Sequence, residues 1–64
     1  MSVVDAAYRV SERCQAEEVD GVLLDLQTAR AIVAVHQALS PENRTKLESL
    51  PVVRAGAIAW KLVR

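Results

Sequence analysis

Five basic side chains near the C-terminus are the residues whose types and spacing best fit a binding chemistry. Arg54, Lys61 and Arg64 are separated by seven and three positions, so they share one side of a helix. Arg44 and Lys46 precede them on a shorter helical segment. A short helix, a tight turn and a helix with a basic side form the outline of a helix-turn-helix, which binds DNA. The pattern therefore makes DNA binding one function to test.

The same segment departs from a DNA-reading helix in two ways. It lacks the Asn, Gln, Ser or Thr side chains that read base edges. Its first turn, Val52-Val53, is apolar where a recognition helix would meet DNA. A solvated basic face explains the pattern better, and DNA binding is the alternative. The candidate residues for binding a protein partner or phosphate are Arg44, Lys46, Arg54, Trp60, Lys61 and Arg64, with Trp60 included on condition that it faces solvent.

Residues suited to catalysis or metal binding are few. His36 is the only histidine and is expected at the edge of an apolar helix face, which is typical of a packing residue. Cys14 falls on the apolar stripe of the first helix, which predicts a buried and unreactive thiol. Glu17 and Glu18 are adjacent, so a helix would point them about a quarter-turn apart rather than pair them. One histidine and one cysteine cannot supply the usual four side-chain ligands of zinc. We therefore expect no enzyme, no metal site and no cofactor.

Length and composition favour a small folded domain that gains stability from a partner. The chain has 64 residues, of which 52% are hydrophobic and 25% charged, and this is the composition of a folded protein. A chain this short buries about 60% of its unfolded surface, so its core is marginal when it stands alone. The single cysteine excludes an internal disulfide. Self-association, or docking on another protein, is then the route by which more surface is buried.

Charge is divided unequally along the chain, although the formal net charge is zero. Residues 1–25 hold six acidic and two basic side chains, a net of −4, and residues 26–64 hold two acidic and six basic ones, a net of +4. Zero net charge argues against a protein that binds nucleic acid over its whole surface. Either the acidic half lies over the basic half of its own chain or of a neighbour, or both halves are solvated helix faces.

The N-terminal third is expected to hold one helix and a break. Ser2 with Asp5 three residues later is an acidic variant of the capping box and predicts a helix over residues 2–17. Within it, Asp5 with Arg9 and Arg13 with Glu17 are predicted i,i+4 charge pairs. Asp20-Gly21 marks the break. Residues 22–24 are either a short extended segment or the first turn of the next helix, and we expect no sheet because no second strand is evident.

Three further helix starts follow. Asp25 predicts the N-cap of a helix over Leu26–Leu39, and Ser40-Pro41 predicts a short helix over Pro41–Ser49. Pro51 restarts the chain into a helix over about Val52–Val63, in which Val53, Ala57 and Trp60 form an apolar line beside Ile58 and Leu62. Gly56 in mid-helix costs ~1 kcal/mol relative to alanine, so we expect a neighbouring element to approach it closely. Two alanine pairs four residues apart also permit close helix packing: Ala34 with Ala38, and Ala55 with Ala59.

Val19–Arg44 (VDGVLLDLQTARAIVAVHQALSPENR), followed by Ala57–Leu62 (AIAWKL), is similar to small proteins encoded by actinobacterial bacteriophages and related prophages, particularly phages of mycobacteria. The motifs that carry this resemblance are apolar patterns and helix caps, and the first helix lies outside it. Most such proteins have no assigned function. The resemblance therefore implies a setting, a phage gene product in the host cytoplasm, and it transfers no catalytic residue.

The predicted fold is all-α, a compact bundle of three to four short helices. It forms a single domain over residues 1–64, with an N-terminal helix in residues 1–19 and a helical core in residues 20–64. The predicted function is a non-enzymatic, self-associating protein–protein interaction module, an accessory phage protein that engages a host or phage protein. The alternative is a small helix-turn-helix-like DNA-binding protein.

Two observations bear on where the protein acts. The longest nearly uncharged stretch, Ala31–Ser40, is far too short to span a bilayer, so no membrane is expected as a partner. The N-terminus carries no basic region followed by an apolar one, as a secretory signal would, and a free thiol fits a reducing compartment. We therefore expect a cytoplasmic protein.

Overall fold

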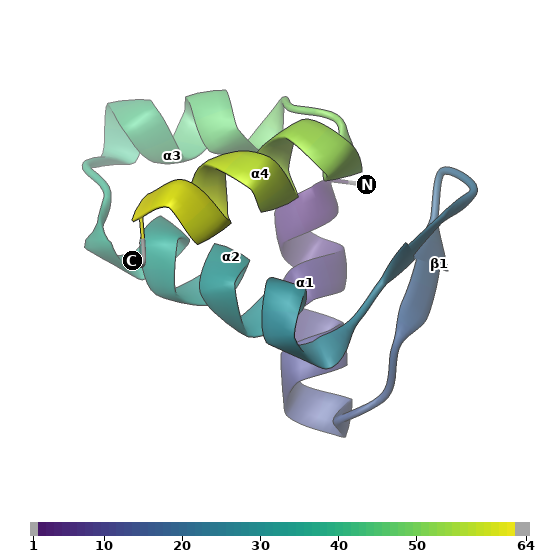
Figure 1. The fold of residues 1–64 in the computed structure, drawn as a ribbon. Coiled ribbons are helices and arrows are strands. Elements are labelled where there is room, and N and C mark those ends of the chain that lie inside the picture. The colour runs from purple at the N-terminus through teal and green to yellow at the C-terminus, as the bar shows by residue number, and fades with distance from the viewer. Residues whose placement is uncertain (1, 63–64) are drawn as a thin grey trace.

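The structure is a computed structural model that describes residues 2–62, and it is mostly but not wholly helical. The described residues form four helices, within the predicted range of three to four, and also a small antiparallel hairpin. The fold is therefore mostly helical, and the prediction of a strictly all-α fold is wrong. Figure 1 shows the helices packed against one another and the hairpin projecting beside them. The elements in chain order are α1 (Val3–Arg13), β1 (Glu17–Val19), β2 (Val22–Leu24), α2 (Leu26–Ala38), α3 (Pro41–Glu48) and α4 (Val52–Leu62).

Helix α1 begins as predicted and ends earlier. The side chain of Ser2 accepts a hydrogen bond from the backbone N–H of Asp5 at 3.2 Å, and the Ser2 N–H donates to Asp5 Oδ2 at 3.4 Å. This confirms the capping box. The helix stops at Arg13, because Cys14 adopts the left-handed conformation with φ 56° that commonly terminates a helix. The acidic residues that follow would meet the negative end of the helix dipole, and they lie outside the helix.

The hairpin corrects the prediction that no sheet would form. β1 pairs with β2 in an antiparallel register that places Glu17 opposite Leu24 and Val19 opposite Val22. Asp20 and Gly21 form the two-residue turn, with φ 51° and 76°. Positive φ at both central positions is what a type I′ turn requires, and Asp-Gly is a preferred sequence for it. Residues 22–24 are therefore extended, which was one of the two open alternatives.

Helices α2 and α3 begin at the predicted caps. The Asp25 side chain accepts a 2.7 Å hydrogen bond from the Thr28 N–H, and the Ser40 hydroxyl accepts one from the Asn43 N–H at 3.4 Å. Pro41 takes the first helical position of α3, where its missing N–H has no intrahelical partner to lose. Local side-chain chemistry thus determines where both helices start.

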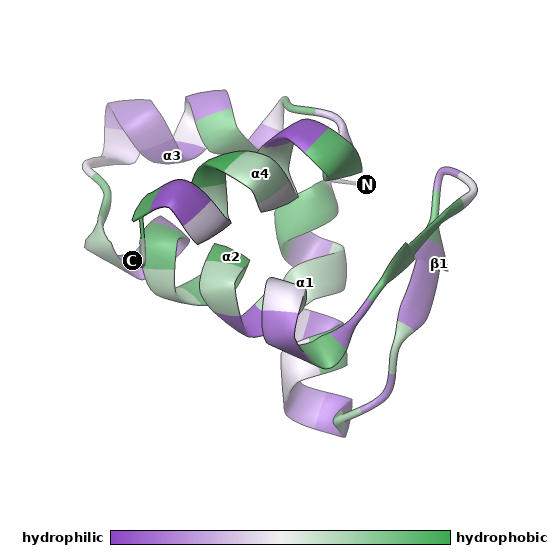
Figure 2. Cartoon of the chain, viewed as in Figure 1, coloured by the Kyte–Doolittle hydropathy of each residue, from purple (hydrophilic) through white to green (hydrophobic). Residues whose placement is uncertain are grey.

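The core lies around α2, which packs against both α1 and α4, and it is built from small and medium side chains. Ile32 and Val10 are the largest side chains that are fully buried. Around them lie alanines of all three helices, including Ala7, Ala29 and Ala59, each with no exposed surface. Helix α3 contributes Leu47 and is the most hydrophilic of the four helices (Figure 2). Among residues 2–62, no helix is long and apolar enough to cross a membrane.

Helix α4 turns its small residues toward the core. Val52, Ala55, Gly56 and Ala59 are buried, whereas the predicted apolar line of Val53, Ala57 and Trp60 faces outward. A Cβ atom at Gly56 would lie 3.1 Å from the Thr28 methyl carbon of α2. This confirms the predicted close approach at Gly56. Small residues on the inner side let α4 lie close to α2, and the same arrangement leaves the larger apolar side chains of α4 other than Val52 exposed.

Candidate interaction surface

The exposed side of α4 holds more of the predicted site residues than any other described element, namely Arg54, Trp60 and Lys61. Arg54 and Lys61 lie seven positions apart on this side, and both are exposed. The helical repeat places them between two rows of apolar side chains. We refer to these residues together as the α4 outer face: Val53, Arg54, Ala57, Ile58, Trp60, Lys61 and Leu62.

Several apolar side chains of the α4 outer face are well exposed. Val53 retains 64% of its surface and Leu62 retains 59%, while Ile58 and Trp60 retain about two-fifths. Single exposed hydrophobic residues are ordinary on a protein surface. Several on one short helix, bordered by basic residues, are typical of a binding surface instead.

Trp60 was a candidate on condition that it faces solvent, and it does so only in part. The residue is 39% exposed, and its Nε1–H donates a 3.1 Å hydrogen bond to the hydroxyl of Thr28 on α2. The indole is therefore anchored at one end and presents part of its ring to solvent. An aromatic side chain held in this way loses little conformational entropy when a partner covers it.

Arg44, on α3, binds the end of α2. Its Nε donates to the carbonyl oxygen of His36 at 2.7 Å, and its Nη2 donates to that of Gln37 at 2.9 Å. These carbonyls lie in the last turn of α2, where few backbone N–H groups remain to bind them; the His36 carbonyl also accepts a 3.4 Å hydrogen bond from the Leu39 N–H. A guanidinium engaged with two carbonyls is not positioned for a phosphate. Of the remaining predicted residues, Lys46 is exposed on α3 and Arg64 lies outside the described residues.

An apolar groove adjoins the end of α4. Two open hollows, of about 300 and 180 Å³, share Leu39 and Leu62 in their linings. The larger also contains Ala34 and Ala38, the predicted small pair of α2, and both alanines are exposed. Lys46 borders the smaller hollow. The groove therefore continues the mixture of apolar and basic residues from α4 toward α2 and α3.

A hydrogen-bonded cluster that the sequence did not predict joins three helices. Tyr8 of α1 is hydrogen-bonded through its hydroxyl to His36 Nδ1 of α2 at 3.1 Å, and His36 Nε2 lies 2.9 Å from Glu48 Oε2 of α3. The two rings also meet edge to face, with centroids 5.7 Å apart. These residues are 28 and 12 positions apart, so no local pattern could have revealed them. Both ring nitrogens of His36 are therefore engaged in contacts between helices. None of the three hollows described within residues 2–62 is lined by Tyr8, His36 or Glu48.

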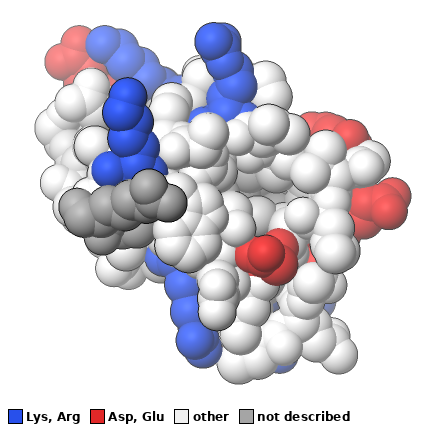
Figure 3. Space-filling model, viewed as in Figure 1, with Lys and Arg blue, Asp and Glu red and all other residues white. Residues whose placement is uncertain are grey.

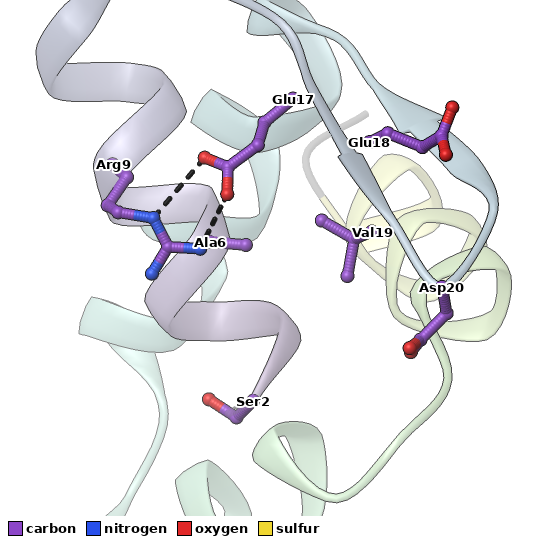
Figure 4. A pocket seen from close by; sticks show the side chains of 7 residues that line it. All are labelled: Ser2, Ala6, Arg9, Glu17, Glu18, Val19 and Asp20. Atoms are coloured by element: carbon purple, nitrogen blue, oxygen red, sulfur yellow. Dashed lines mark hydrogen bonds and ion pairs between the residues drawn. The ribbon is translucent and has the colours of Figure 1, made fainter.

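Arg9 and Glu17 form an ion pair that replaces the two predicted i,i+4 pairs of the first helix. The Arg9 guanidinium binds both carboxylate oxygens of Glu17, at 2.6 and 3.3 Å, and so ties α1 to β1. This hydrogen bonding lowers the pKa of Glu17 below its ordinary value. Figure 4 shows the pair at the side of a hollow of about 180 Å³ between α1 and the hairpin. Glu17 lies in β1 rather than in α1, so it is out of helical register with Arg13.

Cys14 corrects a further prediction. The thiol was expected on the buried stripe of the first helix, but it is exposed at the C-cap of α1. The left-handed backbone at this position turns the chain away from the helix, and the stripe ends at Val10. Among the described residues, no group of three or more His, Cys, Asp or Glu side chains is arranged to hold a metal ion.

The acidic and basic halves of the chain do not neutralise each other through ion pairs in residues 2–62. The Arg9–Glu17 pair lies within the acidic half, and the His36–Glu48 contact lies within the basic half. In Figure 3, several basic side chains lie over the side formed by α3 and α4 and others at the lower edge, and acidic ones lie mostly over the side where the hairpin projects. Comparison of the chain with protein-family models, with curated proteins and with solved structures finds no match.

Proposed function

We propose that this chain is a non-enzymatic protein–protein interaction module that self-associates through the α4 outer face. The proposal rests on the way α4 packs, because the helix turns its small side chains toward the core and most of its larger apolar side chains toward solvent. Its small residues, Ala55, Gly56 and Ala59, fill the core beside Val52, and its other larger apolar residues face solvent. A chain of 64 residues has little apolar surface to leave exposed, and covering this face would bury more of it.

The resemblance to small actinophage proteins supplies the proposed setting. In that setting the chain is an accessory phage protein in the host cytoplasm, and it engages a host or phage protein through the same face. The mixed surface of Trp60, Val53 and the two basic side chains suits a protein partner, because aromatic and arginine residues are enriched in the centres of protein interfaces.

DNA binding is the second candidate, favoured by the exposed Arg54 and Lys61 on one side of a helix that follows a short helix and a turn. Two features weaken it. Arg44 donates to the carbonyls of α2, which removes one of the five proposed phosphate contacts. The start of α4 presents the apolar side chain of Val53 where a recognition helix presents polar ones.

Molar mass in solution, measured by light scattering at low and moderate salt with and without a generic DNA duplex, tests the two functions. We expect a species heavier than the 7.0 kDa monomer that persists as salt rises and is unchanged by DNA. Apolar burial is not screened by salt, whereas phosphate binding weakens steeply as salt rises. A monomer that binds DNA at low salt and releases it as salt rises would instead establish the second candidate.

A matched pair of variants assigns the association to α4. Replacing Val53 and Leu62 together by serine should weaken self-association about tenfold or more, because each loses an apolar contact at an interface. Val53→Ile keeps the surface apolar and should retain association. Both positions are well exposed, so neither change opens a cavity in the core. Equal association by the serine variant and the wild type would exclude this face.

A further inference from the structure

The outward side of the hairpin carries an apolar and acidic surface. Glu18 and Leu23 are register partners, so their side chains project from the same face of the two strands. Leu23 is 68% exposed, the most of any large apolar side chain in the described residues. Asp20 is exposed at the turn, and neither Glu18 nor Asp20 takes part in an ion pair within residues 2–62. We refer to Glu18 and Leu23, together with Asp20 at the adjoining turn, as the hairpin outer face; Asp20 also lines the hollow between α1 and the hairpin.

The hairpin outer face has the same make-up as the α4 outer face, with opposite charge. On α4, the cations of Arg54 and Lys61 lie beside exposed apolar side chains such as Val53. On the hairpin, Glu18 lies opposite the exposed Leu23, and the exposed Asp20 follows at the turn. The two faces are separate surfaces of one molecule, and within residues 2–62 no ion pair joins them.

Charge also argues against the simplest alternative, in which two α4 helices pack on each other. In an antiparallel pair related by a twofold axis, Arg54 of one copy would approach Lys61 of the other. Like charges brought together across an interface disfavour the contact. The α4 outer face therefore needs a partner surface that is apolar and acidic.

We propose that the occupant of the α4 outer face is the hairpin outer face of a second copy of this chain. This inference rests on the proposed self-association and specifies its geometry. Apolar contacts around Leu23 supply the salt-resistant part of the affinity, and the opposite charges select which surfaces meet. Two copies that bind through unlike surfaces form a closed dimer if each copy offers both surfaces to the other. If the contact is not returned, it repeats from copy to copy and forms larger assemblies. The molar mass distinguishes the dimer from the larger assemblies.

Two charge-altered variants test the contact. The first, Arg54→Glu with Lys61→Glu, makes the α4 outer face acidic. The second, Glu18→Lys with Asp20→Asn, makes the hairpin outer face basic, and asparagine tolerates the positive φ at position 20. Each variant alone should associate about tenfold or more weakly than the wild type, because like charges then face each other. An equimolar mixture should associate again, since each hairpin then meets an α4 of opposite charge.

Control variants separate this geometry from a general effect of charge or from unfolding. Arg30→Glu and Glu12→Lys alter exposed charges outside both faces and should leave the molar mass unchanged. Far-UV circular dichroism of every variant should match the wild type. Recovery of association in the mixture also shows that both variants are folded.

The outcomes distinguish failure of this inference from failure of the proposed function. A wild type that associates, with charge variants that associate equally well or a mixture that does not recover, overturns the hairpin contact and leaves self-association intact. A wild type that is monomeric at every concentration overturns both. Recovery in the mixture, with weak association of each variant alone, establishes the contact.

Discussion

The methyl carbon of Thr28 lies 3.1 Å from the position that a Cβ atom would take at Gly56, and the hydroxyl of the same Thr28 accepts the hydrogen bond from Trp60 Nε1. One side chain of α2 thus sets both how closely α4 approaches and how its indole is oriented. The packing of the core and the presentation of the α4 outer face are coupled through this residue.

Substitutions at Gly56 should separate helix propensity from close packing. In Gly56→Ala, a gain of about 1 kcal/mol in helix propensity opposes the tight contact with Thr28, so the free energy of unfolding should change little. Gly56→Leu should lower it by about 3 kcal/mol, because a large side chain cannot fit between the helices. Chemical denaturation measures both. Equal, mild effects of alanine and leucine would contradict close packing at this position.

A second background tests whether the Thr28 methyl is the opposing group. Thr28→Ser removes the methyl and keeps the hydroxyl that accepts from Trp60. In this background Gly56→Ala should become stabilising by about 1 kcal/mol, the full propensity gain. The same small effect of Gly56→Ala in both backgrounds would show that another atom limits the approach.

Arg44 should contribute to stability rather than to binding. Arg44→Ala removes both hydrogen bonds to the last turn of α2 and should lower the free energy of unfolding by about 1–2 kcal/mol. Arg44→Lys should recover only part of this loss, because an ammonium lacks the fork that reaches two carbonyls. Lys46→Ala, at an exposed neighbour on the same helix, is the control and should change stability by less than about 0.5 kcal/mol. Urea denaturation of the three variants decides this.

Asp25 should contribute to the loss of stability in acid. Its hydrogen bond from the Thr28 N–H lowers its pKa below the ordinary value of 3.8. The folded protein therefore binds this proton more weakly than the unfolded chain does. The stabilisation from Asp25 is complete at pH values above the pKa that Asp25 has in the unfolded chain. It is lost as the pH falls through the lower pKa that Asp25 has in the folded protein. Asp25→Asn keeps the cap without the titration, so its unfolding free energy should fall less steeply below about pH 4. Parallel slopes for the two proteins would exclude a role of Asp25 in the acid response.

Cys14 should react readily with thiol reagents in the native protein, since it is exposed at the end of α1. Its labelling rate with a chromogenic disulfide should approach that of the chain in denaturant, and strong protection would contradict the position described. The left-handed backbone also predicts that Cys14→Gly stabilises the fold, by about 0.5–1 kcal/mol, because glycine adopts φ 56° without steric cost. Thermal unfolding of the glycine variant, with Cys14→Ala as the control, tests this second effect.

The positions of the candidate binding residues in the fold followed from the sequence only in part, for a physical reason. Arg54 and Lys61 share a helix, so their common side follows from the helical repeat alone, and the structure places both on the exposed side of α4. The partners of Arg44 are backbone carbonyls of the preceding helix, and no sequence pattern describes them. The cluster of Tyr8, His36 and Glu48 likewise depends on how three helices pack.

The sequence by itself determined where the helices begin. Ser2, Asp25 and Ser40 bind backbone N–H groups three residues ahead, and such short-range hydrogen bonds depend little on the rest of the molecule. Asp20-Gly21 also carried a local signal, since its two positive φ values define a hairpin turn, and this signal was interpreted only as a break. β1 is three residues long and two of them are glutamates, so its apolar pattern was too weak to show a strand.

Only the tertiary structure decided which side of α4 faces inward. Both sides of that helix are apolar, and hydrophobicity alone would favour burial of Val53 and Trp60. Close approach to Thr28 instead selects the side with Ala55, Gly56 and Ala59, because only small residues fit the short distance between α2 and α4. The exposed apolar surface proposed as the binding face is the consequence, since it depends on a distance between two helices that neither helix specifies by itself.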